Sequence, residues 1–172
     1  DYPADRGSYC FWAARADLNK MDERDEEIPC QITKIEAKNL QEFEQKYLET
    51  IPGEMEWNHI YTIFLGPGIA TDKRACIQLM KEWDDAWQKS PNVLLALCSE
   101  LPQKLYKIKN IPKGAAGQEA NRLAEQNKEQ VFKNICETPI DYIRFQEKNE
   151  EKIPLYRITI EGEKIILGRG GI

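Results

Sequence analysis

The chain has 172 residues, which suffices for one buried hydrophobic core but not comfortably for two domains. Its formal net charge of −5 disfavours binding to nucleic acid or to an anionic membrane surface, and no apolar run reaches the ~20 residues of a membrane-spanning helix. We therefore expect a single α+β (or α/β) domain over residues 1–172. Because the first residue is not Met, we also expect a fragment or processed part of a longer chain.

The first fifty residues predict two strands and a helix. Residues 8–16 are aromatic and small, which favours a strand, although the alanines also allow a helix. Residues 30–37 predict a second strand, with a bulge where the apolar alternation breaks. Asn39 and Glu42 have the spacing of a capping box, so we expect a helix that runs to about Leu48.

The central part of the chain predicts a strand–turn–helix–strand unit. Residues 60–65 are an apolar strand, and the turn Gly66-Pro67-Gly68 follows it. An amphipathic helix comes next, with Thr71 as the expected N-cap. The continuous apolar run over residues 93–97 is typical of a strand that is buried on both faces. Together these segments predict a βαβ unit with parallel strands.

The second half predicts one long helix and several strands. The helix is expected over residues 115–136, and a strand over residues 140–145. Residues 155–160 and 165–167 predict two more strands, joined by the turn 161–163 into a C-terminal β-hairpin. The expected architecture is a mixed β-sheet with three main helices.

The five cysteines and the single histidine, His59, restrict the possible chemistry. The cysteines are widely spaced and include no Cys-x-x-Cys pair, which argues against a disulfide framework and against a zinc site. We expect buried free thiols and therefore the cytoplasm or another reducing compartment. No local pattern resembles an activated nucleophile, and we expect no metal and no cofactor. The cysteines are Cys10, Cys30, Cys76, Cys98 and Cys136.

The best candidate for a ligand site is the edge where the central strands end. Ligands of open α/β sheets collect at the carboxyl ends of parallel strands, and two loops, Gly66–Thr71 and Cys98–Glu100, follow these strands here. Backbone N–H groups, hydroxyls and a helix N-terminus together can hold an anion. The candidate ligands are Gly66, Gly68, Thr71 and Ser99. The loop lacks the Lys-Ser/Thr pair of a P-loop and the three glycines of a dinucleotide fold.

A small basic segment lies at residues 104–113. It contains one aromatic residue and no arginine, so binding to nucleic acid is not favoured. The segment is interpreted either as a docking surface for an acidic partner or as an edge strand whose lysines discourage aggregation. Its residues are Lys104, Tyr106, Lys107, Lys109 and Lys113.

The function favoured by these observations is a non-catalytic binding or interaction domain, a subunit or module of a larger assembly with a protein partner. The alternative is an enzyme or sensor that binds a phosphate-bearing small molecule or nucleotide at the Gly66–Thr71 and Cys98–Glu100 loops. In addition, the strand, Gly-Pro-Gly turn and helix over residues 60–83 resemble the second half of a SPOR domain. That family is the glycan-binding module of bacterial division proteins, so the resemblance implies glycan binding.

Overall fold

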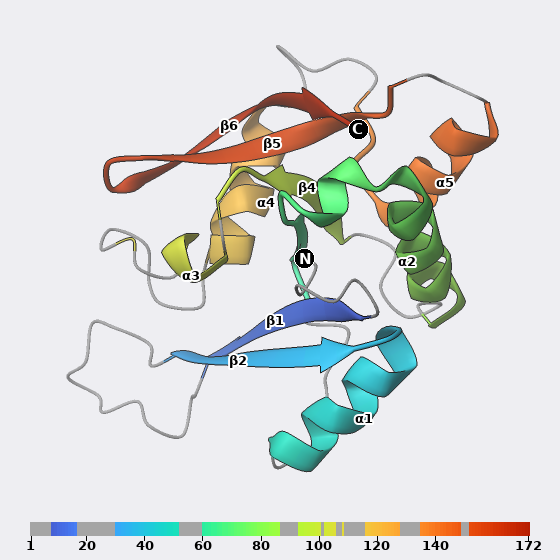
Figure 1. Ribbon diagram of the computed structural model, residues 1–172. Coiled ribbons are helices and arrows are strands. Elements are labelled where there is room, and N and C mark those ends of the chain that lie inside the picture. The colour runs from blue at the N-terminus through green and yellow to red at the C-terminus, as the bar shows by residue number, and fades with distance from the viewer. Residues whose placement is uncertain are drawn as a thin grey trace.

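The computed structural model describes two β-sheets and the helices that cover them (Figure 1). The described residues are 8–16, 30–51, 60–86, 93–100, 102–105, 108, 116–127, 135–148 and 152–172. The strands are β1 (Tyr9–Ala16), β2 (Cys30–Ala37), β3 (Thr62–Leu65), β4 (Leu94–Cys98), β5 (Pro154–Glu161) and β6 (Lys164–Gly171). The helices are α1 (Leu40–Thr50), α2 (Lys73–Ala86), α3 (Pro102–Leu105), α4 (Ala116–Asn127), α5 (Pro139–Glu147) and the short 3₁₀ helix η3 (Ile69–Thr71).

The larger sheet is mixed and has the strand order β3-β4-β5-β6. β3 and β4 run parallel, with Leu65 opposite Leu97, and α2 connects them. β4 and β5 are also parallel, whereas β5 and β6 form an antiparallel hairpin. Gly162 in the hairpin turn has a φ of 61°, a region of backbone space that favours glycine. The α+β class, the predicted βαβ unit and the C-terminal hairpin are therefore confirmed.

Helices cover both faces of this sheet, so the inner strand β4 is buried on two sides. Leu95 and Leu97 belong to the core formed with α2 and α5. Leu94, Ala96 and Cys98 belong to the core formed with α4. We call these two sides the α2–α5 face and the α4 face. Burial of a leucine side chain contributes about 1.5–3 kcal/mol, which explains why this continuous apolar run occupies a central strand.

β1, β2 and α1 form a smaller unit that packs against the first strands of the mixed sheet. The ring of Phe11 in β1 stacks on that of Phe43 in α1, with the ring centroids 4.6 Å apart. The core of this unit extends to Val93 at the start of β4. The backbone N–H of Leu40 donates to the carboxylate of Glu82 in α2 at 3.0 Å. Apolar packing and this hydrogen bond therefore join α1 to the rest of the fold.

Both N-terminal strands are confirmed, but the predicted bulge in β2 is wrong. The antiparallel register continues without interruption along all of β1 and β2. Ile35 is 6% exposed and packs in the core with α1, whereas Ile32 is 38% exposed. The apolar alternation breaks because Ile32 lies on the outer face, and not because an extra residue is inserted.

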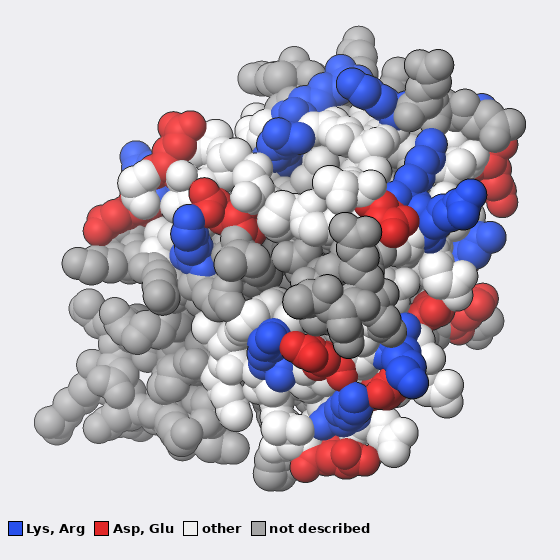
Figure 2. Space-filling view, viewed as in Figure 1, with Lys and Arg blue, Asp and Glu red and all other residues white. Residues whose placement is uncertain are grey.

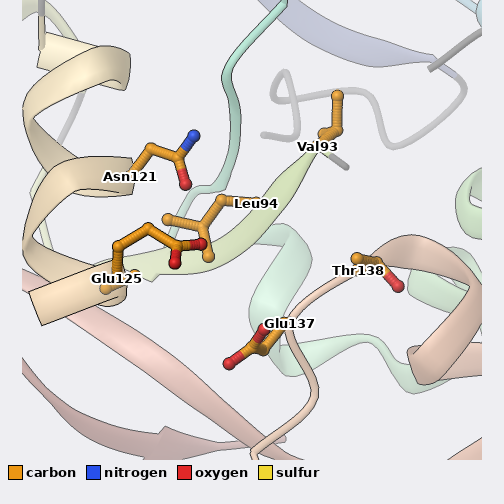
Figure 3. Close-up of a pocket in the computed structure, with 7 residues that line it drawn as sticks. Val93, Leu94, Asn121, Glu125, Glu137 and Thr138 are labelled. Atoms are coloured by element: carbon orange, nitrogen blue, oxygen red, sulfur yellow. The ribbon is translucent and has the colours of Figure 1, made fainter. Parts of the chain in front are cut away.

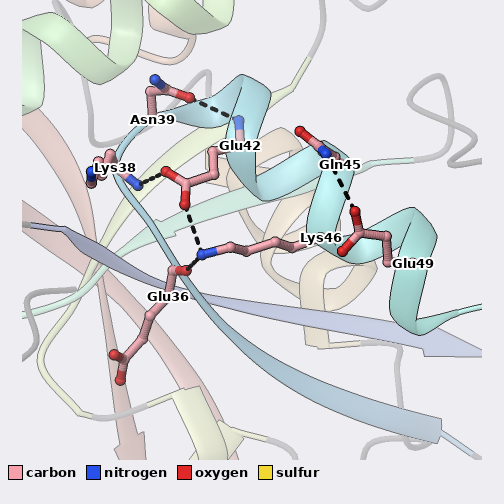
Figure 4. A network of polar contacts seen from close by, with 7 residues as sticks. All are labelled: Glu36, Lys38, Asn39, Glu42, Gln45, Lys46 and Glu49. Atoms are coloured by element: carbon pink, nitrogen blue, oxygen red, sulfur yellow. Dashed lines mark hydrogen bonds and ion pairs between the residues drawn. The ribbon is translucent and has the colours of Figure 1, made fainter.

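A network of polar contacts holds the start of α1 (Figure 4). Asn39 Oδ1 accepts a hydrogen bond from the backbone N–H of Glu42 at 2.8 Å. The Glu42 carboxylate accepts from the N–H of Lys38 at 2.9 Å, one residue earlier than a capping box requires. Lys46 contacts the same carboxylate at 2.7 Å and the Glu36 carbonyl at 2.8 Å. These contacts fix the turn between β2 and α1.

The predicted strand over residues 140–145 is wrong, because this segment forms the helix α5. The Thr138 hydroxyl accepts from the backbone N–H of Asp141 at 3.2 Å, and the Asp141 carboxylate accepts from the N–H of Thr138 at 3.3 Å. Pro139 occupies the first turn, where a helix needs no N–H donor. This complete capping box outweighs the strand propensity of the β-branched and aromatic residues that follow.

The long helix predicted over residues 115–136 ends before its predicted carboxyl end. α4 is described as far as Asn127, and residues 128–134 lie outside the described part of the chain. Cys136 is extended and forms a parallel bridge with Leu155. Its N–H donates to the Pro154 carbonyl at 2.8 Å, so the backbone here extends the sheet. The buried residues of α4 are Ala116, Ala120 and Ala124.

Candidate functional site

The two loops that were predicted to hold an anion lie at one edge of the sheet. Because Leu65 is opposite Leu97 in a parallel pair, Gly66–Thr71 and Cys98–Glu100 leave neighbouring strands in the same direction. This edge is the usual location of ligands in sheets of this kind. The fold therefore brings together the loops that contain Gly66, Gly68, Thr71 and Ser99.

Four hydrogen-bond donors of these loops are used within the protein. Two backbone N–H groups and the Thr71 hydroxyl donate to the carbonyls of Gly66 and Gly68 at distances between 2.8 and 3.3 Å. The bond from the Thr71 N–H to the Gly68 carbonyl is part of η3. In the second loop, the N–H of Ser99 donates to a β5 carbonyl at 3.2 Å. An anion that used these four donors would have to displace these bonds, and the anion site stays a prediction.

A carboxylate already occupies the N-terminus of α2. Asp72 Oδ1 accepts from the backbone N–H of Ala75 at 3.0 Å, which makes Asp72 the N-cap. The prediction of Thr71 as the N-cap is wrong, because its hydroxyl donates to the Gly68 carbonyl at 2.8 Å. The Asp72 side chain therefore supplies the negative charge that an external anion would bring to this helix end.

We expect Asp72→Ala to lower the free energy of unfolding by about 1 kcal/mol, because the N–H of Ala75 loses its acceptor. Urea denaturation measures this change. Asp72→Asn keeps the acceptor and is expected to lose less stability than Asp72→Ala. Asp85→Ala makes the same charge change on an exposed position of α2 and serves as the control. Equal stability of Asp72→Ala and wild type would contradict the assignment of the cap.

The basic segment at residues 104–113 is not an edge strand where the structure describes it. Residues 102–105 form the short helix α3, and Lys104 makes an ion pair with Glu100. Leu105 and Ile108 are buried against the α4 face. Tyr106, Lys107, Lys109 and Lys113 lie outside the described residues. The predicted partner surface therefore stays a prediction.

A pocket of about 390 Å³ lies at the opposite, amino-terminal end of β4 (Figure 3). Figure 3 shows Asn121 and Glu125 reaching from α4 toward the segment that carries Glu137. One Glu137 carboxylate oxygen accepts from the Tyr156 hydroxyl at 3.3 Å. The described lining includes the carboxylates of Glu125 and Glu137 and no basic side chain, which disfavours phosphates and other anions. Its lining residues are Val93, Leu94, Asn121, Ala124, Glu125, Glu137 and Thr138.

Burial favours the protonated form of three thiols, those of Cys76, Cys98 and Cys136. Burial raises the pKa of Cys76 to about 12, and burial also raises the pKa values of Cys98 and Cys136. Since the thiolate is the nucleophilic form, these three side chains stay unreactive at neutral pH. The buried free cysteines are Cys10, Cys76, Cys98 and Cys136. Among the described residues, no cluster of His, Cys, Asp and Glu has the arrangement of a metal site.

β6 is an open edge of the mixed sheet. Ile153 and Ile172 exchange two backbone hydrogen bonds, at 2.9 and 3.2 Å. In an antiparallel pair such doubly bonded residues alternate with residues whose N–H and C=O groups point away from the partner strand. With the continuous register of β5 and β6, the outward-pointing residues are Ile165, Leu167, Arg169 and Gly171. In the described part of the chain no strand pairs with them, and we call this row of backbone groups the β6 edge.

Two exposed arginines flank the β6 edge on opposite faces. Arg157 lies opposite Gly168 on the α2–α5 face. A Cβ atom at Gly170 would lie 3.1 Å from both Cβ and Nε of Arg157, so this side chain lies across Gly170. Arg169 lies opposite Tyr156 on the α4 face. Within the described residues, neither arginine forms an ion pair.

This part of the sheet is basic, in contrast to the chain as a whole. Residues 152–172 include four Lys or Arg and two Glu, a formal charge of +2, whereas the chain has −5. Figure 2 shows basic side chains over β5 and β6 at the top of the view, with acidic ones at the hairpin turn on the left. Sequence reasoning missed this surface. The available signal was the glycine-rich run Gly168-Arg169-Gly170-Gly171 after a β-branched strand.

The fold defines an α+β protein in which helices cover both faces of a four-stranded mixed sheet. Among the described residues, no helix combines the length and the apolar character needed to cross a bilayer. No family model, characterised protein or solved structure matches the chain. The SPOR resemblance therefore stays a prediction, and function has to be argued from the chain's own surfaces.

Proposed function

We propose that this protein is a non-catalytic interaction domain that binds an extended segment of a protein partner along the β6 edge. The observation that carries the proposal is the row of outward-pointing backbone groups at Ile165, Leu167, Arg169 and Gly171, with which no strand of the described residues pairs. An extended peptide that lies beside β6 would satisfy these groups and would add a fifth strand to the sheet.

The β6 edge has few of the devices that usually prevent such pairing. Edge strands are commonly short, interrupted by Pro or a bulge, or covered by another element. β6 has eight residues, no Pro and a continuous register with β5. Its glycines at positions 168, 170 and 171 leave room for an incoming backbone to approach closely. Two features still oppose indiscriminate pairing, namely the charges of Lys164 and Arg169.

The setting that fits this proposal is a reducing compartment such as the cytoplasm. Four described cysteines are buried and free, and structural disulfides are uncommon in reducing compartments. The alternative proposal, an enzyme or sensor for a phosphate-bearing ligand, would use the Gly66–Thr71 and Cys98–Glu100 loops. It is disfavoured because four donors of these loops are already bonded within the protein and Asp72 caps the adjacent helix.

Panning a display library of random dodecapeptides against wild type, Leu167→Ala and Leu167→Pro tests the proposal. Leu167 points its N–H outward, so Pro removes one donor and places its ring in the path of the peptide without breaking a bond to β5. Leu167→Ala removes the same side chain and keeps the donor. Peptides enriched on wild type are expected to bind Leu167→Ala similarly and Leu167→Pro about tenfold more weakly.

Circular dichroism and thermal melting of both variants confirm that the comparison uses folded protein. The proposal is overturned if no peptide is enriched on wild type. It is also overturned if the enriched peptides bind the Pro and Ala variants equally, because binding would then not use the backbone of β6.

A further inference from the structure

The geometry of β6 restricts the side chains of a segment added beside it. Successive residues of a strand point to opposite faces of the sheet, and cross-strand neighbours share a face. A residue placed next to Gly170 therefore lies on the α2–α5 face, and the residue before or after it, next to Arg169, lies on the α4 face. Each face presents one exposed arginine at this position.

On the α2–α5 face the arginine comes from β5 and not from the edge strand itself. The Arg157 side chain lies across Gly170, and a Cβ atom there would come within 2.9 Å of Leu97 Cδ1 and 3.1 Å of Arg157 Nε. A side chain at this position would displace Leu97 or Arg157, so glycine leaves the space in which Arg157 extends over β6. An added strand meets no β6 side chain at Gly170, and the Arg157 side chain lies there instead.

On the α4 face the arginine is Arg169, on the edge strand. It is exposed, and its partner on β5, Tyr156, is fully buried. Within the described residues neither Arg157 nor Arg169 has an ion pair to give up on binding. Guanidinium groups pair preferentially with carboxylates, often through two hydrogen bonds.

We infer that the segment bound at the β6 edge carries two adjacent acidic side chains, one for Arg157 and one for Arg169. The inference rests on the proposed strand addition and names the chemical class of its partner, an acidic extended peptide. Adjacent acids satisfy both arginines because they point to opposite faces. Two acids separated by one residue point to the same face and satisfy only one arginine.

A second copy of this chain fits the edge less well than an acidic peptide. Pairing of two β6 strands would bring together two sheet regions that each have a formal charge of +2 over residues 152–172. Like charges across neighbouring strands are destabilising. Charge complementarity therefore favours a partner of opposite sign, and self-association becomes an outcome of the test.

Fluorescence anisotropy with three capped octapeptides tests the inference at low salt. The probes are Thr-Val-Thr-Glu-Glu-Thr-Val-Thr, the same peptide with Gln-Gln at the centre, and Thr-Val-Glu-Thr-Glu-Val-Thr-Val. We expect the adjacent-acid peptide to bind about tenfold more tightly than the Gln-Gln peptide, with the separated-acid peptide between them. Arg157→Gln and Arg169→Gln should each weaken the adjacent-acid peptide about threefold. Lys164→Gln, the same charge change at the hairpin end, is the matched control.

The outcomes separate this inference from the proposed function. If the Glu-Glu and Gln-Gln peptides bind equally and both are lost on Leu167→Pro, strand addition stands and the acidic partner is overturned. If no octapeptide binds and the library also gives none, strand addition itself is overturned. Analytical ultracentrifugation tests whether a second copy of this chain occupies the β6 edge. A dimer that Leu167→Pro abolishes would show that β6 pairs with a second copy, which would overturn the inference.

Discussion

Tyr142→Ala is expected to lower the free energy of unfolding by about 3–5 kcal/mol. Tyr142 is fully buried in the core that α5 forms with α2 and the sheet, and burial raises the pKa of its hydroxyl. Removal of the ring leaves a cavity beside Cys76 and Leu155, which the packed helices cannot close. Urea denaturation followed by tryptophan fluorescence measures the change.

Tyr61→Ala is the matched control for this prediction. Tyr61 is 44% exposed and precedes β3, so the loss of the same side chain should change stability by no more than about 0.5 kcal/mol. If the two variants were equally stable, the Tyr142 ring would not be a core side chain and the placement of α5 against α2 would be wrong.

Gly170→Val is expected to destabilise the protein by about 1–3 kcal/mol, although valine normally favours strands. The added Cβ would lie 2.9 Å from Leu97 Cδ1 and 3.1 Å from Arg157 Cβ, and Leu97 is a buried core residue. The leucine and the arginine must both move, which costs packing on the α2–α5 face. Thermal and urea denaturation report this loss.

Gly168→Val provides the comparison on the same strand and the same face. The nearest atom to a Cβ at Gly168 is the Arg157 carbonyl oxygen at 3.9 Å, an ordinary contact. Valine there should leave stability unchanged or raise it by up to about 1 kcal/mol, since it suits the strand and restricts the unfolded chain. A larger loss at position 168 than at position 170 would contradict the described position of Arg157.

Much of the fold follows from local patterns in the sequence. The continuous apolar run over residues 93–97 predicts a strand buried on both faces, and β4 is such a strand. The Asn39 and Glu42 spacing locates the start of α1 correctly. Such patterns succeed because the period of apolar residues reports directly which sides of an element are buried.

The errors in the predicted secondary structure arise where one short sequence pattern is compatible with two different structures. Thr138-Pro139 is compatible with the end of one helix and with the start of another, because Pro stops a helix before it and suits the first turn after it. The deciding residue is Asp141, which completes the capping box with Thr138. Residues 140–145 then form a helix despite their strand propensity, since Tyr142 gains full burial against α2.

The candidate site was less predictable from the sequence than the fold, because its contacts join segments that lie far apart in the chain. The sequence predicts the loops at the carboxyl edge of β3 and β4, but it does not show that Asp72 caps α2 or that Ser99 binds β5. It also predicts the C-terminal hairpin without showing that β6 is the last strand of the sheet. The strand order places β6 at the end of the sheet, where no described strand pairs with its outer side.

The sequence by itself determined the α+β class, the βαβ unit, the buried thiols and the hairpin, because each depends on residues close together or on the alternation of apolar side chains. The tertiary structure decided the strand order, the two covered faces and the position of Arg157 across Gly170. These depend on which distant segments share one core. The physical reason is that apolar periodicity specifies which side of an element is buried, whereas packing between elements specifies what covers it.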